Sequence, residues 1–305
     1  MIATIFAYTG DGVDNRQVAT GQNTTPLLVV LFGNTAQISI WKTASMGTDT
    51  APYSGGAAVI SGAIKSLNSD GTITLGTDAT ANGNTVAYYG LAIVDDGAGD
   101  VAVGSYTGNG SDNRDISIAG TLSGTPDLVW IKRSDSQGFT WRSSLHSGDS
   151  ASFNAAAADA ANIIQAFGSG TFQVGTNNAS NASGQTYYYA AFKAAANVFA
   201  VFTYTGNGAD NRDVTGLTTF RPAYVFTHAS NQVSFIRTDD IAGDASKSVS
   251  ANAFLTDRIQ AILDTGMQVG TNAQVNNSGT TYIGYAFGVR RIPIIQHHRQ
   301  QQGAA

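Results

Sequence analysis

One nine-residue motif occurs three times in this chain of 305 residues. Residues 8–16 read YTGDGVDNR, residues 106–114 read YTGNGSDNR and residues 204–212 read YTGNGADNR, so seven of the nine positions are common to all copies and each copy starts 98 residues after the previous one. This period is too long for a solenoid or a propeller, whose units span about 20–50 residues, and it fits an independent sandwich domain. The chain is therefore predicted to be three tandem copies of one module.

Other landmarks keep the same order in each third of the chain. A proline opens an apolar run in every copy, as PLLVVLF, PDLVWIK and PAYVFTH, and proline is tolerated at the first residue of a strand, where no ladder hydrogen bond is lost. An LGT or VGT segment follows, and each copy ends on an aromatic strand, in which we align Val86 with Tyr187 and Tyr282. These landmarks predict modules at residues 1–97, 98–196 and 197–290, followed by a tail at residues 291–305.

The composition favours strands over helices. All 21 acidic residues are Asp, five residues are Lys, and Gly occurs 35 times. Glu and Lys are good helix formers, whereas Asp, Asn, Ser, Thr and Gly favour turns, and Val, Ile, Tyr and Phe favour strands. We expect an all-β chain of three tandem β-sandwich domains, each folded around its own apolar interior. The runs VVLF and LVWIK are too apolar to alternate, so both faces of these strands are expected to be covered.

One short helix per module is also expected. The Ala-rich residues 151–166 and the spacing of apolar residues in 251–264 allow a helix at this place in the second and third copies. The first copy has several glycines there and fits the expectation less well. Residues 194–198 lead almost directly from one module to the next, so the modules are expected to sit close together, like beads with little slack.

Several classes of protein do not fit this composition. With no cysteine, the chain cannot form disulfides, zinc–thiolate sites or thiol nucleophiles. The net charge of −5 gives no support to nucleic-acid binding, which needs a basic face. No stretch approaches the roughly 18 apolar residues of a membrane span, and residues 1–10 lack the features of a signal peptide. We expect a protein without membrane or nucleic-acid partners that reaches its destination by assembly rather than by export.

The motifs, taken in order, resemble a repeat family of tailed phages. YTGNGxDNR, PDLVWIK, FxWRSS, FQVGTN and GxTYYYAAFK are together similar to a repeat domain of tail fibre, virion structural and decoration proteins. The resemblance covers about residues 4–290 and is strongest in the middle copy. The first copy departs from it, because it has LLVVLF in place of LVWIK and lacks the Trp-Arg pair of the following strand. The resemblance implies jelly-roll or concanavalin-like sandwiches on a virus particle, and it implies no catalytic residues.

The repeated turn has two interpretations. Asp14, Asp112 and Asp210 could supply oxygen ligands for calcium. However, the EF-hand spacing and its closing Glu are absent, and glycine-rich calcium repeats need immediate tandem stacking, whereas this motif occurs once per module. The alternative is a tight turn, in which Gly supplies positive φ, Asp or Asn bonds its own backbone, and the Arg returns to a carboxylate or to carbonyls. We favour the turn, so no cofactor is predicted and calcium remains the alternative.

No catalytic constellation recurs in the three copies. His146 and His228 sit at unrelated positions in their modules, and the GxSxG motif of a serine nucleophile is absent. A glycosidase would need two carboxyl groups flanking a cleft, and nothing in the sequence singles out a pair of Asp residues. We therefore expect a non-enzymatic protein.

Aromatic side chains are the candidate ligand-binding residues. Trp130, Trp141 and Tyr188 could stack on the apolar faces of a sugar. Alternate residues of a strand face opposite ways, so Tyr187 and Tyr189 share one face and Tyr188 takes the other. At least one of these faces must be core, and burial in the core is the favoured alternative for the tryptophans.

The tail is the only basic stretch of the chain. Arg290, Arg291, Ile294 and Ile295 could form an arm that docks in an acidic or apolar groove on a partner subunit. A frayed terminus is the alternative of equal weight.

Together these features favour a capsid decoration (cement) protein on the exterior of a virion, assembled in the host cytoplasm. The repeats begin near residue 4, no heptad or collagen-like stalk is present, and three similar modules could mimic a trimer on a three-fold site. The expected partners are major capsid or tail proteins, with copies arranged as a homo-oligomer or array and held by many linked contacts. The alternative is a tail fibre or spike that binds a host receptor or surface carbohydrate.

Overall fold

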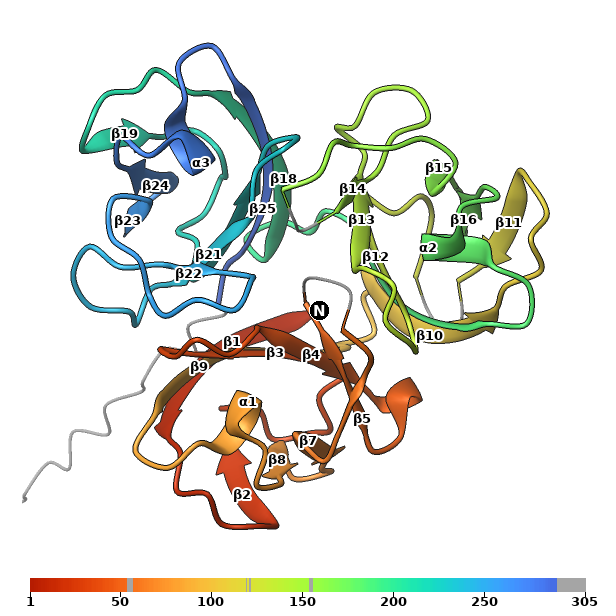
Figure 1. Cartoon of the computed structure of the whole chain (residues 1–305), viewed down its shortest axis with the longest axis horizontal. Helices are drawn as coiled ribbons and strands as arrows, with labels where there is room; N and C mark the ends of the chain where they lie inside the picture. The colour runs from red at the N-terminus through yellow and green to blue at the C-terminus, as the bar shows by residue number, and fades with distance from the viewer. Residues whose placement is uncertain (54–56, 119, 121, 154–155, 290–305) are drawn as a thin grey trace, which may run out of the picture.

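The computed structural model describes residues 1–53, 57–118, 120, 122–153 and 156–289. Within these ranges nearly all regular structure is antiparallel β-sheet, so the predicted all-β fold class is confirmed. Figure 1 shows the three repeats arranged around a common centre, with the first residue close to that centre. We call residues 1–97, 98–196 and 197–289 repeats 1, 2 and 3.

Repeat 1 consists of one large and one small sheet. The large sheet has the strand order β1-β9-β3-β4-β5-β6, and the small sheet has the order β2-β8-β7. The bounds are β1 (Ile2–Thr9), β2 (Arg16–Ala19), β3 (Leu28–Gly33), β4 (Ile40–Thr43), β5 (Asp49–Pro52), β6 (Ile60–Ser61), β7 (Ile64–Leu67), β8 (Thr72–Leu75) and β9 (Ala87–Val94).

Repeats 2 and 3 have the same topology with five strands in the large sheet. The orders are β10-β17-β12-β13-β14 and β18-β25-β20-β21-β22, and the small sheets are β11-β16-β15 and β19-β24-β23. The bounds in repeat 2 are β10 (Val101–Thr107), β11 (Arg114–Ser117), β12 (Leu128–Arg133), β13 (Thr140–Ser143), β14 (Ser152–Phe153), β15 (Ile164–Gly168), β16 (Thr171–Val174) and β17 (Thr186–Phe192). Those in repeat 3 are β18 (Phe199–Thr205), β19 (Arg212–Val214), β20 (Tyr224–His228), β21 (Phe235–Thr238), β22 (Lys247–Ser248), β23 (Ile259–Leu263), β24 (Gly266–Val269) and β25 (Thr281–Phe287).

The two sheets of each repeat enclose an apolar core. In repeat 2, Val129 and Ile131 of the large sheet and Ile116, Phe172 and Val174 of the small sheet belong to one buried cluster. Repeats 1 and 3 have equivalent clusters between their sheets. This two-layer arrangement is that of a β-sandwich.

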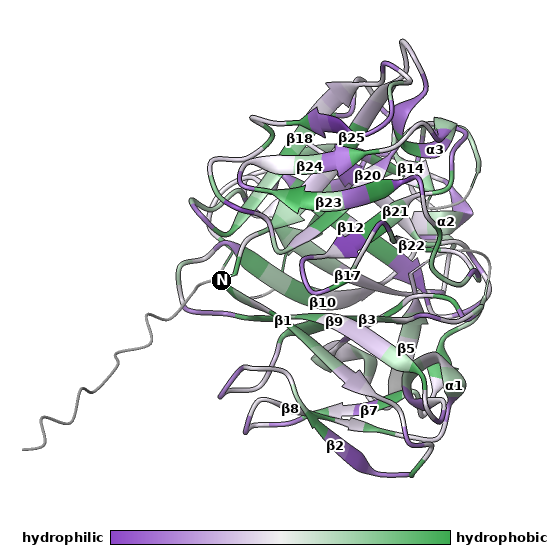
Figure 2. Cartoon of the chain, turned by 90° about the vertical axis from the view of Figure 1, so that its left-hand side faces the viewer, coloured by the Kyte–Doolittle hydropathy of each residue, from purple (hydrophilic) through white to green (hydrophobic). Residues whose placement is uncertain are grey.

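A fourth cluster joins all three repeats. Along β3, Val29 and Leu31 belong to the cluster inside repeat 1, whereas Leu28, Val30 and Phe32 belong to a cluster that also contains residues of repeats 2 and 3. Successive residues of a strand face opposite ways, so the large sheet is covered on both faces, as the unbroken apolar run predicts. Figure 2 shows the sheet of β1, β9 and β3 between the small sheet of repeat 1 and the other repeats.

The contacts between the repeats close into a ring. The backbone N–H of Val59 donates to the carbonyl of Ser134 at 3.4 Å, from repeat 1 to repeat 2. At the equivalent places Asp159 N–H donates to Ser230 Oγ at 3.1 Å, from repeat 2 to repeat 3, and Phe254 N–H donates to Asn34 Oδ1 at 3.0 Å, from repeat 3 back to repeat 1. We call these contacts seams 1–2, 2–3 and 3–1.

Two expectations about the modules need correction. The repeats are not folded around separate interiors alone. In addition to the core inside each repeat, the outer faces of the three large sheets form the shared cluster. The alignment of Val86 with Tyr187 and Tyr282 is also wrong by two residues. Tyr88 is the register partner of Tyr8, as Tyr187 is of Tyr106 and Tyr282 of Tyr204.

The expected helices lie elsewhere. In the described parts of residues 151–166 and 251–264 there are strands, loops and isolated bridges, and no helix. The short helices are instead α1 (Ala79–Asn82), α2 (Asn178–Asn181) and α3 (Ala273–Asn276), with a 3-10 turn, η1, at Ala44–Met46. Each α-helix starts after an Asp or Asn whose side chain accepts a backbone N–H, a capping signal that outweighs Ala content. No helix in the described chain is long and apolar enough to span a membrane.

Candidate functional site

The repeated motif forms an exposed turn with one geometry in all three copies. Gly110 and Asn113 have φ values of 74° and 53°, in the left-handed region that Gly and Asn tolerate best. The guanidinium of Arg114 then reaches back and donates to Thr107 O at 2.7 Å. Arg212 donates to Thr205 O at the same distance, and Arg16 makes the equivalent bond to Thr9 O. In each copy the Arg returns to a backbone carbonyl, as the tight-turn interpretation of the motif predicts.

A buried asparagine connects this turn to the rest of the repeat. Asn181 Oδ1 accepts from Asn109 N–H at 3.0 Å and from Arg114 at 3.1 Å, and its amide donates to Ser111 O at 2.7 Å and Gly175 O at 3.0 Å. Asn82 and Asn276 make the corresponding bonds in the other repeats. The turn is therefore a rigid part of the sandwich surface.

The calcium candidates lie in three separate turns and do not come together. Asp14 pairs with the ammonium of Lys65, which holds the pKa of that carboxyl below its usual value. Asp112 accepts from Gln165 at 3.0 Å, and Asp210 accepts from Gln260 at 3.1 Å. The described residues contain no group of three or more Asp or His side chains placed to hold a metal ion. In repeat 1 a protein cation already occupies the position next to the carboxylate.

The tryptophans cannot serve as a carbohydrate platform in this structure. Trp130 and Trp141 are register partners on β12 and β13 and have no exposed surface. Both belong to the shared cluster, where Trp130 packs edge-on against Trp41 at 5.9 Å. They lie at the place where three repeats meet, so their rings contribute to assembly of the fold. Tyr188 is half-buried and packs against the same cluster.

The remaining candidates cannot be placed. Arg290, Arg291, Ile294 and Ile295 lie outside the described residues, so the docking arm remains a prediction. The structure describes the chain up to Val289, which lines a pocket of about 530 Å³ near the centre of the ring.

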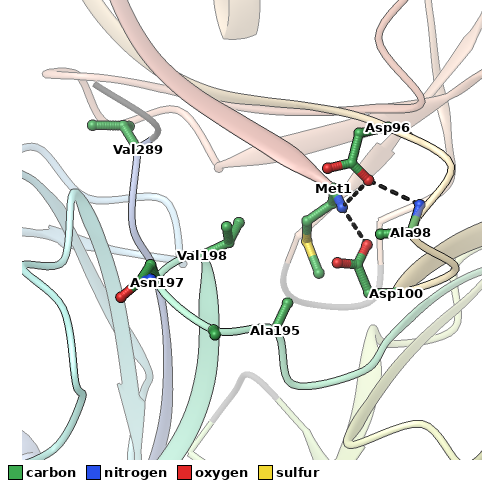
Figure 3. Close-up of a pocket in the computed structure, with 9 residues that line it drawn as sticks. Met1, Asp96, Ala98, Asp100, Ala195, Asn197, Val198 and Val289 are labelled. Carbon is green, nitrogen blue, oxygen red and sulfur yellow. Dashed lines mark hydrogen bonds and ion pairs between the residues drawn. The ribbon is translucent and has the colours of Figure 1, made fainter. Parts of the chain in front are cut away.

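That pocket is formed by chain segments that join the repeats. The amine of Met1 donates to Asp96 at 2.8 Å and also pairs with Asp100, while residues 195–198 form the opposite side (Figure 3). The amine lowers the pKa of Asp96. Because one cation is already bound between the two carboxylates, they do not form a free acid–base pair.

A buried cation lies on the strand that follows the apolar run in each repeat. The guanidinium of Arg142 donates to Gly148 O at 2.6 Å and to Ile164 O at 3.3 Å, and Arg237 donates to Ile241 O and Gly243 O at 2.7 and 2.8 Å. Lys42, on β4 at the same register position, donates to Gly47 O at 2.6 Å. The first repeat therefore has a Trp-Lys pair, Trp41-Lys42, in place of the Trp-Arg pair of repeat 2.

One family model matches the part of the chain that contains repeats 1 and 2. The model of the "Domain of unknown function (DUF7483)" matches residues 3–197, which is more than half of the chain. The chain belongs to the DUF7483 family. The DUF7483 match spans repeats 1 and 2 and ends just before β18, while repeat 3 has the same two sheets and the same turn. No curated protein matches the chain.

One cluster in this DUF7483 protein escaped the sequence analysis. His146 and Asp159 of repeat 2 and His228 of repeat 3 lie together at seam 2–3. The histidines occupy different positions in their repeats, which argued against a joint role. They meet because the ring contact brings different parts of neighbouring repeats together, a relationship that a comparison of equivalent positions does not reveal.

Proposed function

We propose that the protein is a non-enzymatic structural protein of a phage particle, and that it decorates the outside of the capsid at a three-fold position. The observation that carries this proposal is the closed ring of three repeats in one chain. A closed ring presents the same surface features three times around its centre, as a symmetric trimer does. A single chain of this kind matches a site surrounded by three copies of a shell protein.

The exposed turns support this proposal. In every repeat the turn is held by the same Arg and Asn bonds, so its backbone needs little ordering on binding. Preorganised contacts lose less free energy on association, and three linked contacts raise the overall affinity without a deep pocket. The partners are then capsid or tail proteins of the same particle.

The histidine cluster favours a structural role over catalysis. His146 is 7% exposed and His228 is 1% exposed. Their rings pack edge-on against Trp141, at 4.8 and 5.7 Å. A substrate would have to separate two repeats to reach them.

Electron cryo-microscopy of particles that carry the protein tests the proposal. The expected result is three-lobed density on the capsid surface, at positions where three shell subunits meet. Particles from a deletion mutant of the gene serve as the control and should lack this density. Density confined to the tail tip, together with strong binding on a glycan array, would instead support a host-binding fibre or spike.

A further inference from the structure

Seam 2–3 contains a connected set of ionisable side chains. His146, in the loop after β13, lies with its Nε2 atom 2.8 Å from Ser152 Oγ. Ser152 Oγ donates to Asp159 Oδ1 at 2.7 Å. From the other side of the seam, His228 of β20 places its Nε2 atom 3.6 Å from the same carboxylate oxygen. The Asp159 carboxylate of repeat 2 therefore lies between two imidazoles, that of His146 in its own repeat and that of His228 in repeat 3.

The backbone fixes the proton of His146. The N–H of Ser143 donates to His146 Nδ1 at 3.1 Å, and a backbone N–H can only donate. In the neutral ring the proton must therefore be on Nε2, from where it is donated to Ser152 Oγ. A second proton would have to bind Nδ1, which faces the N–H of Ser143 and lies 3.0 Å from Ser143 Oγ. Protonated His146 cannot keep its present position without the loss of that bond.

His228 is almost completely enclosed. Its Nδ1 atom lies 3.0 Å from Ser234 Oγ, and its Nε2 atom has no hydrogen-bond partner among the described residues. Shortly after His228 the backbone is bonded across the seam, because Asn231 N–H donates to Ala157 O at 3.0 Å. The Asp159 carboxylate faces the Nε2 atom of His228 across the seam.

The charge balance of the cluster changes with proton uptake. The charged groups that face the imidazoles are Asp159 and the guanidinium of Arg142, which lies beside the His146 loop and donates to His146 O at 3.5 Å. With His146 neutral, the positive charge of Arg142 offsets the negative charge of Asp159. With His146 protonated, the enclosed cluster carries a formal excess of one positive charge, and burial of uncompensated charge is costly.

The other two seams have no imidazole at these positions. Met46 and Ile241 stand where repeat 2 has His146, and both are buried. At seam 3–1, Phe32 takes the position of His228 and Phe254 that of Asp159, with ring centres 6.4 Å apart. At seam 1–2 these positions hold Lys132, which donates to carbonyls of its own turn, and Val59. The ring therefore has one seam whose contacts depend on pH in the acid range.

We propose that seam 2–3 is an acid-sensitive opening point, at which proton uptake by His146 separates repeats 2 and 3 while the other two seams remain closed. Opening exposes the part of the shared cluster that lies behind the histidines, including Trp141 and Phe226, which pack against each other at 5.2 Å.

The direction of the pH effect follows from the pKa values. The pKa of His146 is lowered from 6.5 to about 4, mainly by burial; Asp159 opposes this shift, and Arg142 and His228 contribute to it. The pKa of Asp159 is lowered by its hydrogen bonds and by the two imidazoles, although burial alone would raise it. Because the folded pKa of His146 is depressed, the contribution of its neutral form to stability is present above pH 6.5 and is lost as the pH falls through about 4.

Hydrogen–deuterium exchange of the full chain, corrected for intrinsic rates, tests the proposal. Between about pH 7 and about pH 4, the protection of the Asp159 and Asn231 amides at seam 2–3 should fall by about tenfold or more. The amide of Phe254 at seam 3–1 should keep its protection, which distinguishes local opening from unfolding of the ring. An equal loss of protection at both seams, or no loss at either, would overturn the proposal.

The chain itself supplies matched variants. His146→Met copies Met46 and should abolish the acid response of seam 2–3, because it removes the group that takes up the proton. The triple variant that adds Asp159→Phe and His228→Phe, after Phe254 and Phe32, should likewise show no response if the single variant does not fold. A seam 2–3 that still opened in acid in the folded variants would show that the histidine cluster is not responsible. Because the readout is a property of the isolated protein, it does not depend on whether the protein decorates a capsid.

Discussion

The hydroxyl of Tyr53, in repeat 1, is hydrogen-bonded to the hydroxyl of Tyr285, in the last strand of repeat 3. Tyr224 OH also approaches Tyr53 OH, at 3.4 Å, and the Tyr53 ring packs edge-on against Trp130 of repeat 2 at 5.2 Å. A single side chain of repeat 1 thus contacts both other repeats. The contact joins residues 232 positions apart, and it lies where the three large sheets meet.

Removal of the Tyr285 hydroxyl should weaken the whole ring. In the Tyr285→Phe variant the buried hydroxyl of Tyr53 loses its closest partner, which costs about 1–2 kcal/mol of unfolding free energy. Urea denaturation measures this loss. Tyr224→Phe is the matched control, because the 3.4 Å bond of Tyr224 is longer and its removal should cost less. Equal losses in the two variants would mean that the Tyr53–Tyr285 bond has no special weight.

Separation of the repeats should expose the shared cluster. A fragment of residues 197–289 keeps its own two-sheet core but leaves Phe199, Tyr224, Phe226, Tyr285 and Phe287 without the partners that now cover them. Such a large apolar face favours association. We expect this fragment to self-associate in light scattering and to form a one-to-one complex with a fragment of residues 1–196. A fragment that stayed monomeric and ignored its partner would show that the shared cluster contributes little.

The asparagine behind the turn should matter more than the exposed residues of the turn. Asn181 has no exposed surface, and its side chain makes four hydrogen bonds. Asn181→Ala leaves several of these groups without a partner and should cost about 2–4 kcal/mol. Ser111→Ala, which copies Ala209 of repeat 3, is the control and should change stability by less than about 0.5 kcal/mol. Thermal unfolding of both variants measures the difference, and similar melting temperatures would contradict it.

The local features of the fold could be predicted from the sequence because they depend on short-range chemistry. The Gly and Asn of the repeated turn are needed for positive φ, and the Arg that follows them has only nearby carbonyls to bind. The unbroken apolar run at Leu28–Gly33 indicated a strand covered on both faces, and the structure places a cluster on each side of it. The repeat period likewise predicted the tandem order of the sandwiches, because each copy carries the same local signals.

The arrangement of the repeats could not be predicted in this way. Whether Trp130 faces a sugar or another repeat depends on what covers the outer face of its sheet, and this cover comes from residues such as Trp41 and Tyr285, far away along the chain. The histidine cluster has the same origin, because Asp159 and His228 occupy unlike positions in their repeats. The helices lie elsewhere than predicted because they start after Asn177 and Asn272, whose side chains cap them, and Ala content does not mark these positions.

The buried cation after each apolar run should tolerate lysine but not alanine. Arg142 donates to Gly148 O, in the loop that leads to β14, and to Ile164 O of β15, and in repeat 1 the Lys42 ammonium donates to Gly47 O. Arg142→Lys should therefore keep the fold and cost about 1 kcal/mol, because fewer carbonyls find a donor. Arg142→Ala leaves these carbonyls buried without a partner and should cost about 3 kcal/mol or more. Lys193→Ala, which removes one exposed bond to Ser123 O, is the control. Urea denaturation should show the smallest loss of stability for this control, a larger loss for Arg142→Lys and the largest loss for Arg142→Ala. If Arg142→Ala were no less stable than Arg142→Lys, the guanidinium would not be what holds the loop.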